Sequence, residues 1–145
     1  MIGVARYATL FVPMLWVGML VGISFLEAPL RFRAPGVTLT IGLGIGRLVF
    51  RALNAAEVAL LAVLVGAVLV TRPDAPAGVL LAATAGVLVV QLVGVRPPLN
   101  RRSDRVLAGE QLPRSKPHLA YVGLEVVKVV LLVALSIVLA GQALR

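Results

Sequence analysis

The residues best suited to do chemistry form two polar stripes in an otherwise apolar chain. The first stripe consists of Arg47, Arg51, Asn54 and Glu57. At 100° per residue these four side chains fall within about 120° of one another on one face of a helix. A guanidinium group binds phosphate or carboxylate, often through two hydrogen bonds. The first stripe therefore predicts a binding site for an anionic group.

The second stripe consists of His118, Tyr121, Glu125 and Lys128. These side chains lie within about 80° on one helix face. His118 and Tyr121 are the candidate catalytic residues because either can move a proton, with Glu57 or Glu125 orienting it. The chain has one histidine and no cysteine, so a protein-only zinc site and a thiol nucleophile are not expected. We predict no metal site, and the sequence identifies no cofactor.

The composition is that of a membrane protein. Of its 145 residues, 60% are hydrophobic and 14% are charged, and the mean hydropathy is +1.03. Average soluble domains carry about 25% charged residues. Each of four apolar stretches is about 19 to 23 residues long, enough for a helix to cross roughly 30 Å of hydrocarbon. We predict one all-α integral membrane domain, a bundle of four transmembrane helices at about 8–26, 48–70, 77–95 and 119–139.

The net charge of +8 is explained by membrane topology, without a nucleic-acid partner. Ten of the fourteen basic residues flank the connections 27–47 and 96–118, three lie near the termini and the second connection, and Lys128 lies in a span. The positive-inside rule predicts that these two connections are cytoplasmic and that both termini face the other side of a bacterial inner membrane. The expected partners are the lipid bilayer and anionic headgroups. The residues expected to face the headgroups are Arg31, Arg33, Arg101, Arg102 and Arg105.

Proline and glycine suggest where the helices start and stop. Ala28-Pro29 is expected to end the first helix near Glu27. The segment 37–50 is either the start of the second helix or a re-entrant piece, and its glycines favour close helix packing. These glycines are Gly42, Gly44 and Gly46.

The third connection predicts a short basic helix. Asn100 is expected to cap this helix, which runs through Leu107 and is closed by Gly109. Ser115 is expected to be the N-cap of the last span. In the first span, Trp16 is expected to be a packing or interface residue.

The two stripes are expected to face each other, because spans two and four both start on the cytoplasmic side and therefore run parallel. Arg47 to Glu57 and His118 to Lys128 are each ten residues apart, so Glu57 lies level with Lys128. An unpaired charge at the bilayer centre costs about 3 kcal/mol by insertion scales, so the charges should meet one another. We predict the ion pairs Glu57–Lys128 and Arg51–Glu125, with Arg51 also near Tyr121 and Asn54 near Glu125. Glu27 is expected to meet Arg47 or Arg51, and Gln91 is expected to approach from the third span.

All these polar residues fall in the cytoplasmic half of the spans, which favours a pocket open to one side over a through-going path. We expect the pocket to bind a small anionic or amphipathic ligand, such as a lipid-like molecule, a quinone or a conjugated metabolite. The predicted ligand-binding residues are Arg47, Arg51, Asn54, Glu57, Glu125, Lys128, Glu27 and Gln91. The alternatives are a small oligomeric transporter, a membrane-bound transferase and a structural subunit of a membrane complex. A purely structural interpretation is that the charges only neutralise one another and fix helix register.

The stretch from Arg47 to Glu57 reads RLVFRALNAAE and resembles the second-helix signature of the MAPEG family, the membrane-associated proteins of eicosanoid and glutathione metabolism. The resemblance implies four spans in each subunit of a homo-oligomer. It further implies that Arg51, Asn54 and Glu57 contact glutathione at a cytoplasm-facing site between subunits of a trimer.

Over the whole chain, the pattern is similar to small bacterial four-helix membrane proteins of unknown function. Three features carry this similarity. They are Glu27-Ala-Pro, the arginine-rich start of the second span, and His118-x-x-Tyr121-x-x-x-Glu125-x-x-Lys128. This second resemblance implies the four-span fold and no particular activity.

Overall fold

The computed structural model describes residues 1–112 and 116–145, and four long apolar helices account for most of them. The first comprises α1 (Ile2–Leu20), η1 (Val21–Glu27) and α2 (Ala28–Arg31), and the second is α3 (Leu39–Thr71). The third comprises α4 (Ala75–Val90), η2 (Gln91–Val95) and α5 (Arg96–Leu107), and the fourth is α6 (Lys116–Ala143). Each is long and apolar enough to cross a membrane. The predicted all-α bundle of four transmembrane helices is confirmed.

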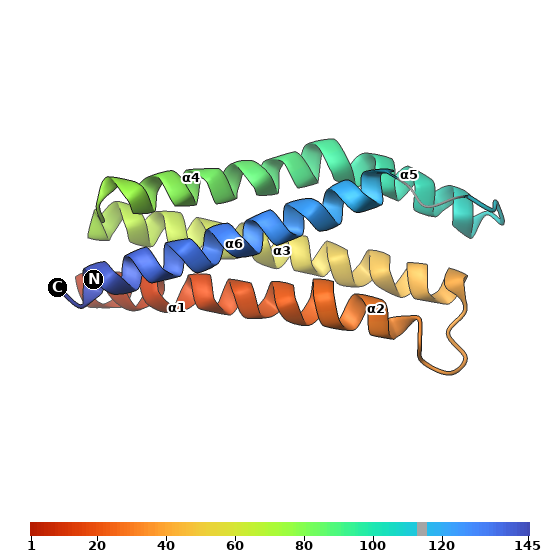
Figure 1. Ribbon diagram of the computed structural model, residues 1–145, viewed down its shortest axis with the longest axis horizontal. Helices are drawn as coiled ribbons and strands as arrows, with labels where there is room; N and C mark the ends of the chain where they lie inside the picture. Colours follow the sequence, from red (N-terminus) through yellow and green to blue (C-terminus); the bar gives the residue numbers. More distant parts are fainter. Residues whose placement is uncertain (113–115) are drawn as a thin grey trace.

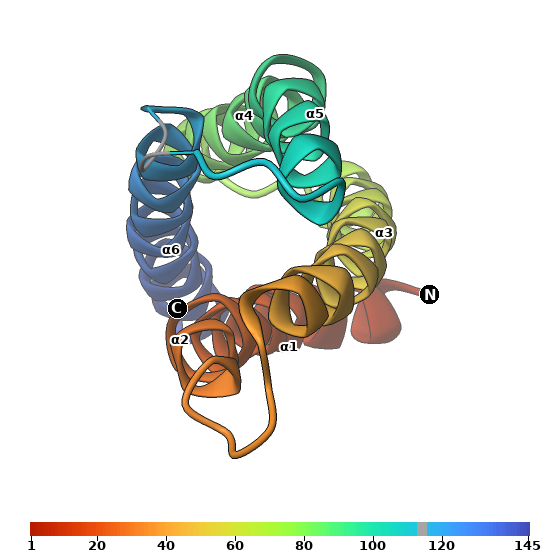
Figure 2. The ribbon, with the colours of Figure 1, turned by 90° about the vertical axis from the view of Figure 1, so that its right-hand side faces the viewer.

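The helices alternate in direction, so the bundle has two distinct ends (Figure 1). Both chain termini and the turn at 72–74 lie at one end, which we call the terminal end. The segment 32–38 and α5 lie at the other end, which we call the basic end. Figure 2 looks at the bundle from the basic end and shows that α3 and α6 occupy opposite corners, with α1 between them on one side. As predicted, α3 and α6 run in the same direction.

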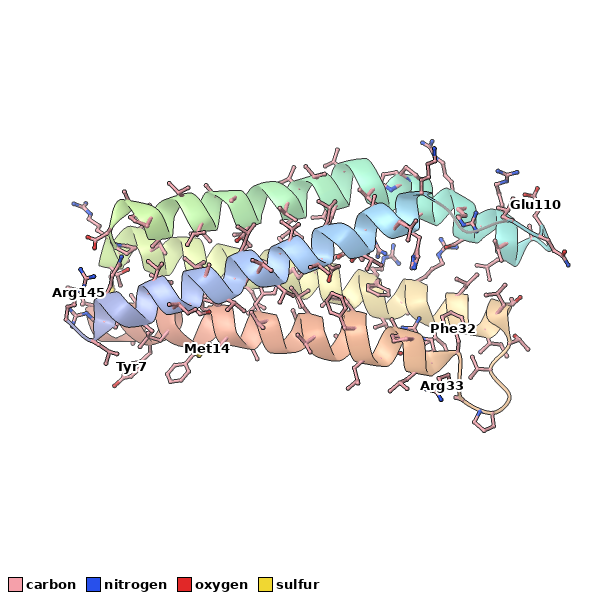
Figure 3. The ribbon with its side chains drawn as sticks, viewed as in Figure 1. Tyr7, Met14, Phe32, Arg33, Glu110 and Arg145 are labelled. Carbon is pink, nitrogen blue, oxygen red and sulfur yellow. The ribbon has the colours of Figure 1, made fainter. Side chains whose placement is uncertain are left out.

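The outer surface of the bundle is apolar. Large hydrophobic side chains such as Phe11, Leu69 and Ile137 are more than 60% exposed. In Figure 3, Tyr7 and Met14 project outward from α1, whereas Arg33, Glu110 and Arg145 lie at the two ends of the bundle. A surface of this kind is stable against lipid and not against water. The chain is a multi-pass integral membrane protein.

The first and third helices extend beyond the ends of their predicted spans because prolines do not end them. The prediction that the first helix ends near Glu27 is wrong, since the helix continues through Pro29 to Arg31. Proline removes one helical hydrogen bond and its ring clashes with the carbonyl four residues earlier. Here the preceding turns widen into a π-helix, η1, in which the Ala28 N–H donates to the Ile23 carbonyl. The third helix repeats this arrangement, with η2 placed just before Pro97.

The segment 37–50 is not re-entrant, because α3 starts at Leu39 and continues without a break. Its N-cap is Thr38, whose hydroxyl accepts a hydrogen bond from the backbone N–H of Ile41. A Cβ added to Gly42 would clash with the ring of Phe32, and one added to Gly46 would clash with the guanidinium of Arg31. Predicted close packing is thus confirmed at these two glycines.

The third glycine of this segment, Gly44, has no described atom within 4 Å of an added Cβ, so close packing does not extend to it. In the third helix, Asn100 lies inside α5 and does not cap it, because the helix continues directly from η2. Gly109, with φ +98°, closes α5 as predicted. The predicted N-cap of the last span, Ser115, lies outside the described residues.

Candidate functional site

An ion pair crosses the interior of the bundle between opposite corners. Lys128 Nζ of α6 lies 2.5 Å from Glu57 Oε1 of α3, and both side chains are 0% exposed. The two residues were paired from their equal distance along parallel helices, and the prediction is confirmed. Lipid surrounds the bundle, so Glu57 and Lys128 avoid contact with hydrocarbon by facing each other in its interior.

Lys128 has two further acceptors, so all three of its N–H groups are used. Its Nζ lies 2.8 Å from Glu125 Oε1, one turn earlier on α6, and 2.6 Å from Gln91 Oε1 at the start of η2. Gln91 in turn donates from Nε2 to Glu125 Oε1 at 2.8 Å. The prediction that Gln91 approaches the stripes from the third span is therefore confirmed.

Two residues of the first helix complete the network. Trp16 Nε1 donates to Glu57 Oε1 at 2.9 Å, and Ser24 Oγ donates to Glu125 Oε2 at 2.8 Å. Trp16 is 0% exposed and is part of the polar network, so its expected role of packing or interface residue is incomplete. We call Trp16, Ser24, Glu57, Gln91, Glu125 and Lys128 the buried polar cluster.

The buried polar cluster lies at membrane depth. Glu57 is 14 residues from Thr71, and Lys128 is 15 residues from Ala143. At 1.5 Å per residue the cluster is about 21 to 23 Å from the terminal end of the bundle. This depth is beyond the middle of a roughly 30 Å hydrocarbon layer that starts at the terminal end.

The predicted Arg51–Glu125 pair is wrong. Arg51 is exposed and makes no ion pair with a described residue, while Glu125 is occupied by Lys128, Gln91 and Ser24. On α3, Arg51 and Glu57 are six residues apart and therefore about 120° apart around the helix axis. When Glu57 faces the interior, Arg51 faces outward. Asn54 lies between the two and is buried, but its side chain makes no hydrogen bond with Glu125.

The predicted partners of Glu27 are also wrong. Glu27 binds Arg31 one turn later on its own helix, and the Nε–Oε1 distance is 2.8 Å. Arg31 also donates to the Gly42 carbonyl of α3 at 3.1 Å. Arg47 pairs instead with Asp104 of α5, and this pair is on the surface. These contacts join the connections at the basic end and lie outside the buried polar cluster.

A cavity of about 580 Å³ opens at the basic end, between η1, α2, α3, α5 and α6. Its walls carry four aromatic rings, those of Phe25, Phe32, Phe50 and Tyr121. Its cationic side chains are Arg31 and Arg96, and His118 also lines it. Ser24 and Glu125 belong both to the cavity wall and to the buried polar cluster, so the two features are continuous. The cavity thus combines aromatic surface, positive charge and access to a buried carboxylate.

Arg96 is a cavity residue that sequence reasoning missed. Its guanidinium carbon lies 5.9 Å from the ring centre of Phe50 and 6.0 Å from that of Tyr121, within the range of cation–π attraction. Among the described residues it has no carboxylate partner. The available signal was its position, five residues after Gln91 and at the end of the third apolar stretch.

The two candidate catalytic residues both line the cavity but differ in burial. His118 is exposed at the start of α6. Tyr121 is 5% exposed, and its ring packs edge-on against Phe50 with centroids 5.7 Å apart. Its hydroxyl is buried and has no hydrogen-bond partner among the described residues. Buried hydroxyl groups are nearly always hydrogen-bonded, so this one is suited to a bound ligand.

Within residues 1–112 and 116–145, no group of three or more His, Cys, Asp or Glu side chains is placed to hold a metal ion. Comparisons with protein-family models, with curated proteins and with solved structures find no match to this chain. The function is therefore inferred from the geometry of the cavity and of the buried polar cluster.

Proposed function

We propose that this protein binds a small amphipathic anion in the cavity at the basic end. The observation that carries the proposal is that two polar groups without a polar partner lie on the same aromatic-lined wall of the cavity. Among the described residues, the Arg96 guanidinium has no carboxylate partner and the buried Tyr121 hydroxyl has no hydrogen-bond partner. A phosphate or carboxylate satisfies both, while an acyl chain or ring packs against Phe25, Phe32 and Phe50.

The size of the cavity supports a ligand of this class. Ligand pockets in proteins typically have volumes of about 300 to 1,000 Å³ and are mostly apolar with a few polar groups. At about 580 Å³, with two arginine and four aromatic side chains, the cavity suits a single-chain lipid-like anion or a conjugated metabolite. A quinone is a poorer match, because it brings no negative charge to Arg96.

The interior beyond the buried polar cluster supports a one-sided pocket over a transport path. Toward the terminal end the buried side chains are mostly apolar, among them Leu64, Leu132 and Leu135. The buried hydroxyls described there, those of Thr9, Thr84 and Ser136, donate to carbonyls of their own helices. A through-going path requires polar groups along its whole length.

The burial of the charges argues against the alternative of a structural subunit. Such a subunit would turn its stripes outward to a partner, whereas Glu57, Glu125 and Lys128 are at most 1% exposed within this chain. A glutathione site of the MAPEG type has less support, because Arg51 and Glu57 lie on different sides of α3.

We further propose that the basic end faces the cytoplasm of a bacterial inner membrane, since the basic residues concentrate there. Arg33, Arg101, Arg102 and Arg105 are the proposed contacts for anionic headgroups. Arg31 has a different role, because its side chain is 6% exposed and is held by Glu27. Alkaline phosphatase fused to the C-terminus should be active if the termini are outside the cytoplasm. An inactive fusion would indicate the opposite orientation.

Photolabelling tests the proposed binding site. The probe is a diazirine-bearing dodecyl phosphate added to the purified protein in lipid nanodiscs, with labelled peptides mapped by mass spectrometry. Labels should concentrate on the cavity segments, and excess unlabelled dodecyl phosphate should compete. Arg96→Gln should weaken labelling about tenfold, because a hydrogen bond to a charged group contributes about 1.5 kcal/mol or more.

The matched control is Arg101→Gln, which removes an arginine on α5 that does not line the cavity. This variant should label like the unmodified protein. Equal labelling of the Arg96→Gln and unmodified proteins, or labels spread over the lipid-facing surface, would contradict the proposal.

A further inference from the structure

The charges of the buried polar cluster do not balance. Two carboxylates, Glu57 and Glu125, face one ammonium group, Lys128, and all three side chains are at most 1% exposed. With every group ionised, the cluster carries one net negative charge inside the membrane. An uncompensated charge there is strongly unfavourable.

Within the part of the chain that the structure describes, no other charged group forms an ion pair with the cluster. Beyond its own members, the titratable groups next to the cluster are Tyr121 of α6 and Arg96 at the start of α5. Arg96 stacks on the rings of Phe50 and Tyr121 and makes no ion pair with either carboxylate. The first helix contributes only the neutral donors Trp16 and Ser24, and the third contributes the neutral amide of Gln91.

The two carboxylates are not equivalent. Glu125 uses both oxygens, since Oε1 accepts from Lys128 and Gln91 and Oε2 accepts from Ser24. Glu57 uses only Oε1, which meets Trp16 and Lys128. Its Oε2 is buried and has no hydrogen-bond partner among the described residues. A bare carboxylate oxygen in such a place costs more than a protonated one.

We propose that the buried polar cluster is a proton-binding site that holds one proton per chain at neutral pH, on Glu57 Oε2. The Lys128–Glu125 ion pair lies beside it, and the Lys128 contact with Glu57 Oε1 is then a hydrogen bond to a neutral acid. Binding adds one proton from water to the Glu57 carboxylate and gives the carboxylic acid. The site exchanges through the cavity at the basic end, which Glu125 lines, because the interior on the other side is mostly apolar. This inference does not depend on a ligand in the cavity.

Infrared spectroscopy counts such protons directly. The protein, labelled with ¹³C at glutamate side-chain carboxyls to separate its signal from lipid esters, is measured in liposomes at neutral pH. The unmodified protein should show one protonated carboxyl per chain, and the band should shift after transfer to D₂O. A spectrum that shows only ionised carboxylates would overturn the proposal, whether or not sodium is present in the buffer. A band that never exchanges would overturn the route through the cavity.

Variants test whether charge balance in the cluster sets the number of protonated carboxyl groups per chain. Glu57→Gln and Glu125→Gln each leave one carboxylate opposite Lys128, so the band should disappear in both. Lys128→Met leaves two carboxylates without a cation, so the band should double. The matched control Glu110→Gln removes a surface carboxylate paired with Arg105 and should leave the count at one. A band that survives Glu57→Gln at full intensity would overturn the assignment, and the unmodified protein decides the count even if Lys128→Met fails to fold.

Discussion

The two halves of the bundle are held together by different interactions. Toward the terminal end the helices meet through packed apolar side chains such as Leu64, Leu132 and Leu135. Toward the basic end they meet through the buried polar cluster, and beyond it a cavity remains open. In lipid, apolar contact between helices gives packing energy but little hydrophobic driving force. The comparison indicates that the polar half fixes which helices face each other and leaves the cavity open, while the apolar half closes the bundle.

The largest effect is expected from Lys128→Met, which leaves two buried carboxylates without their cation. Breaking a buried ion pair from one side costs about 3 to 5 kcal/mol. The free energy of unfolding in detergent should fall by that amount, whereas Lys116→Met, at the exposed start of α6, should change it little. The double variant with Glu57→Gln should be milder than the sum of the single variants, by roughly 2 kcal/mol. Additive losses would mean that the two residues do not interact.

A smaller effect is expected in the apolar half from Leu132→Ala. Leu132 is 0% exposed, and truncating a buried leucine costs about 2 kcal/mol at the lower end of the usual range. The lower end applies because lipid also solvates apolar side chains. Thermal unfolding measures the loss, and photolabelling of the cavity should not change. Val130→Ala, at a lipid-facing position, is the control. A loss of cavity labelling in Leu132→Ala would show that packing in the apolar half affects the cavity.

Trp16→Phe should have the next largest effect, because it keeps an aromatic ring but removes the N–H that binds Glu57. A hydrogen bond of this kind contributes about 1 to 2 kcal/mol. The loss is measured by chemical unfolding in detergent. The control Phe11→Leu changes an exposed ring on the same helix and should be neutral. If both substitutions cost the same, the indole N–H contributes nothing specific.

The smallest effect on stability is expected from Gly42→Ala at the cavity wall. An added Cβ would displace the Phe32 ring, while alanine favours the helix by up to about 1 kcal/mol, so stability should change by less than that. Labelling of the cavity should nevertheless fall severalfold, since Phe32 lines it. Gly44→Ala has open space around it and should leave labelling unchanged. Equal labelling of both variants would remove Phe32 from the binding site.

The spans and the central ion pair could be predicted from the sequence for simple physical reasons. Hydropathy and length identify four helices that a membrane requires. Parallel helices place residues at equal distances from their starts at one depth, which correctly paired Glu57 with Lys128. The same reasoning failed for Arg51, because a stripe 120° wide is too wide for both of its edges to face the interior.

Other parts of the site required the structure. The sequence prediction ended the first helix before Pro29, but inside a membrane protein the neighbouring turns widen and the helix continues. The continuation adds Ala28, Pro29 and Arg31 to the cavity wall, and the widened turns before it contain Ser24, which donates to Glu125. The position of Trp16 in the sequence indicated a buried hydrogen-bond partner, and the prediction missed this. A tryptophan in the middle of a span, away from either membrane surface, needs an acceptor for its N–H.

A solid-state NMR measurement in liposomes tests most directly whether Lys128 contacts both Glu57 and Glu125. Dipolar coupling is recorded between ¹⁵N of the lysine side chain and ¹³C of the glutamate carboxyls in a Lys116→Arg background, which leaves Lys128 as the single lysine. The structure predicts strong coupling of the Lys128 nitrogen to two carboxyl carbons, falling to one in Glu57→Gln. A lysine nitrogen without coupling to any glutamate carboxyl would contradict the account.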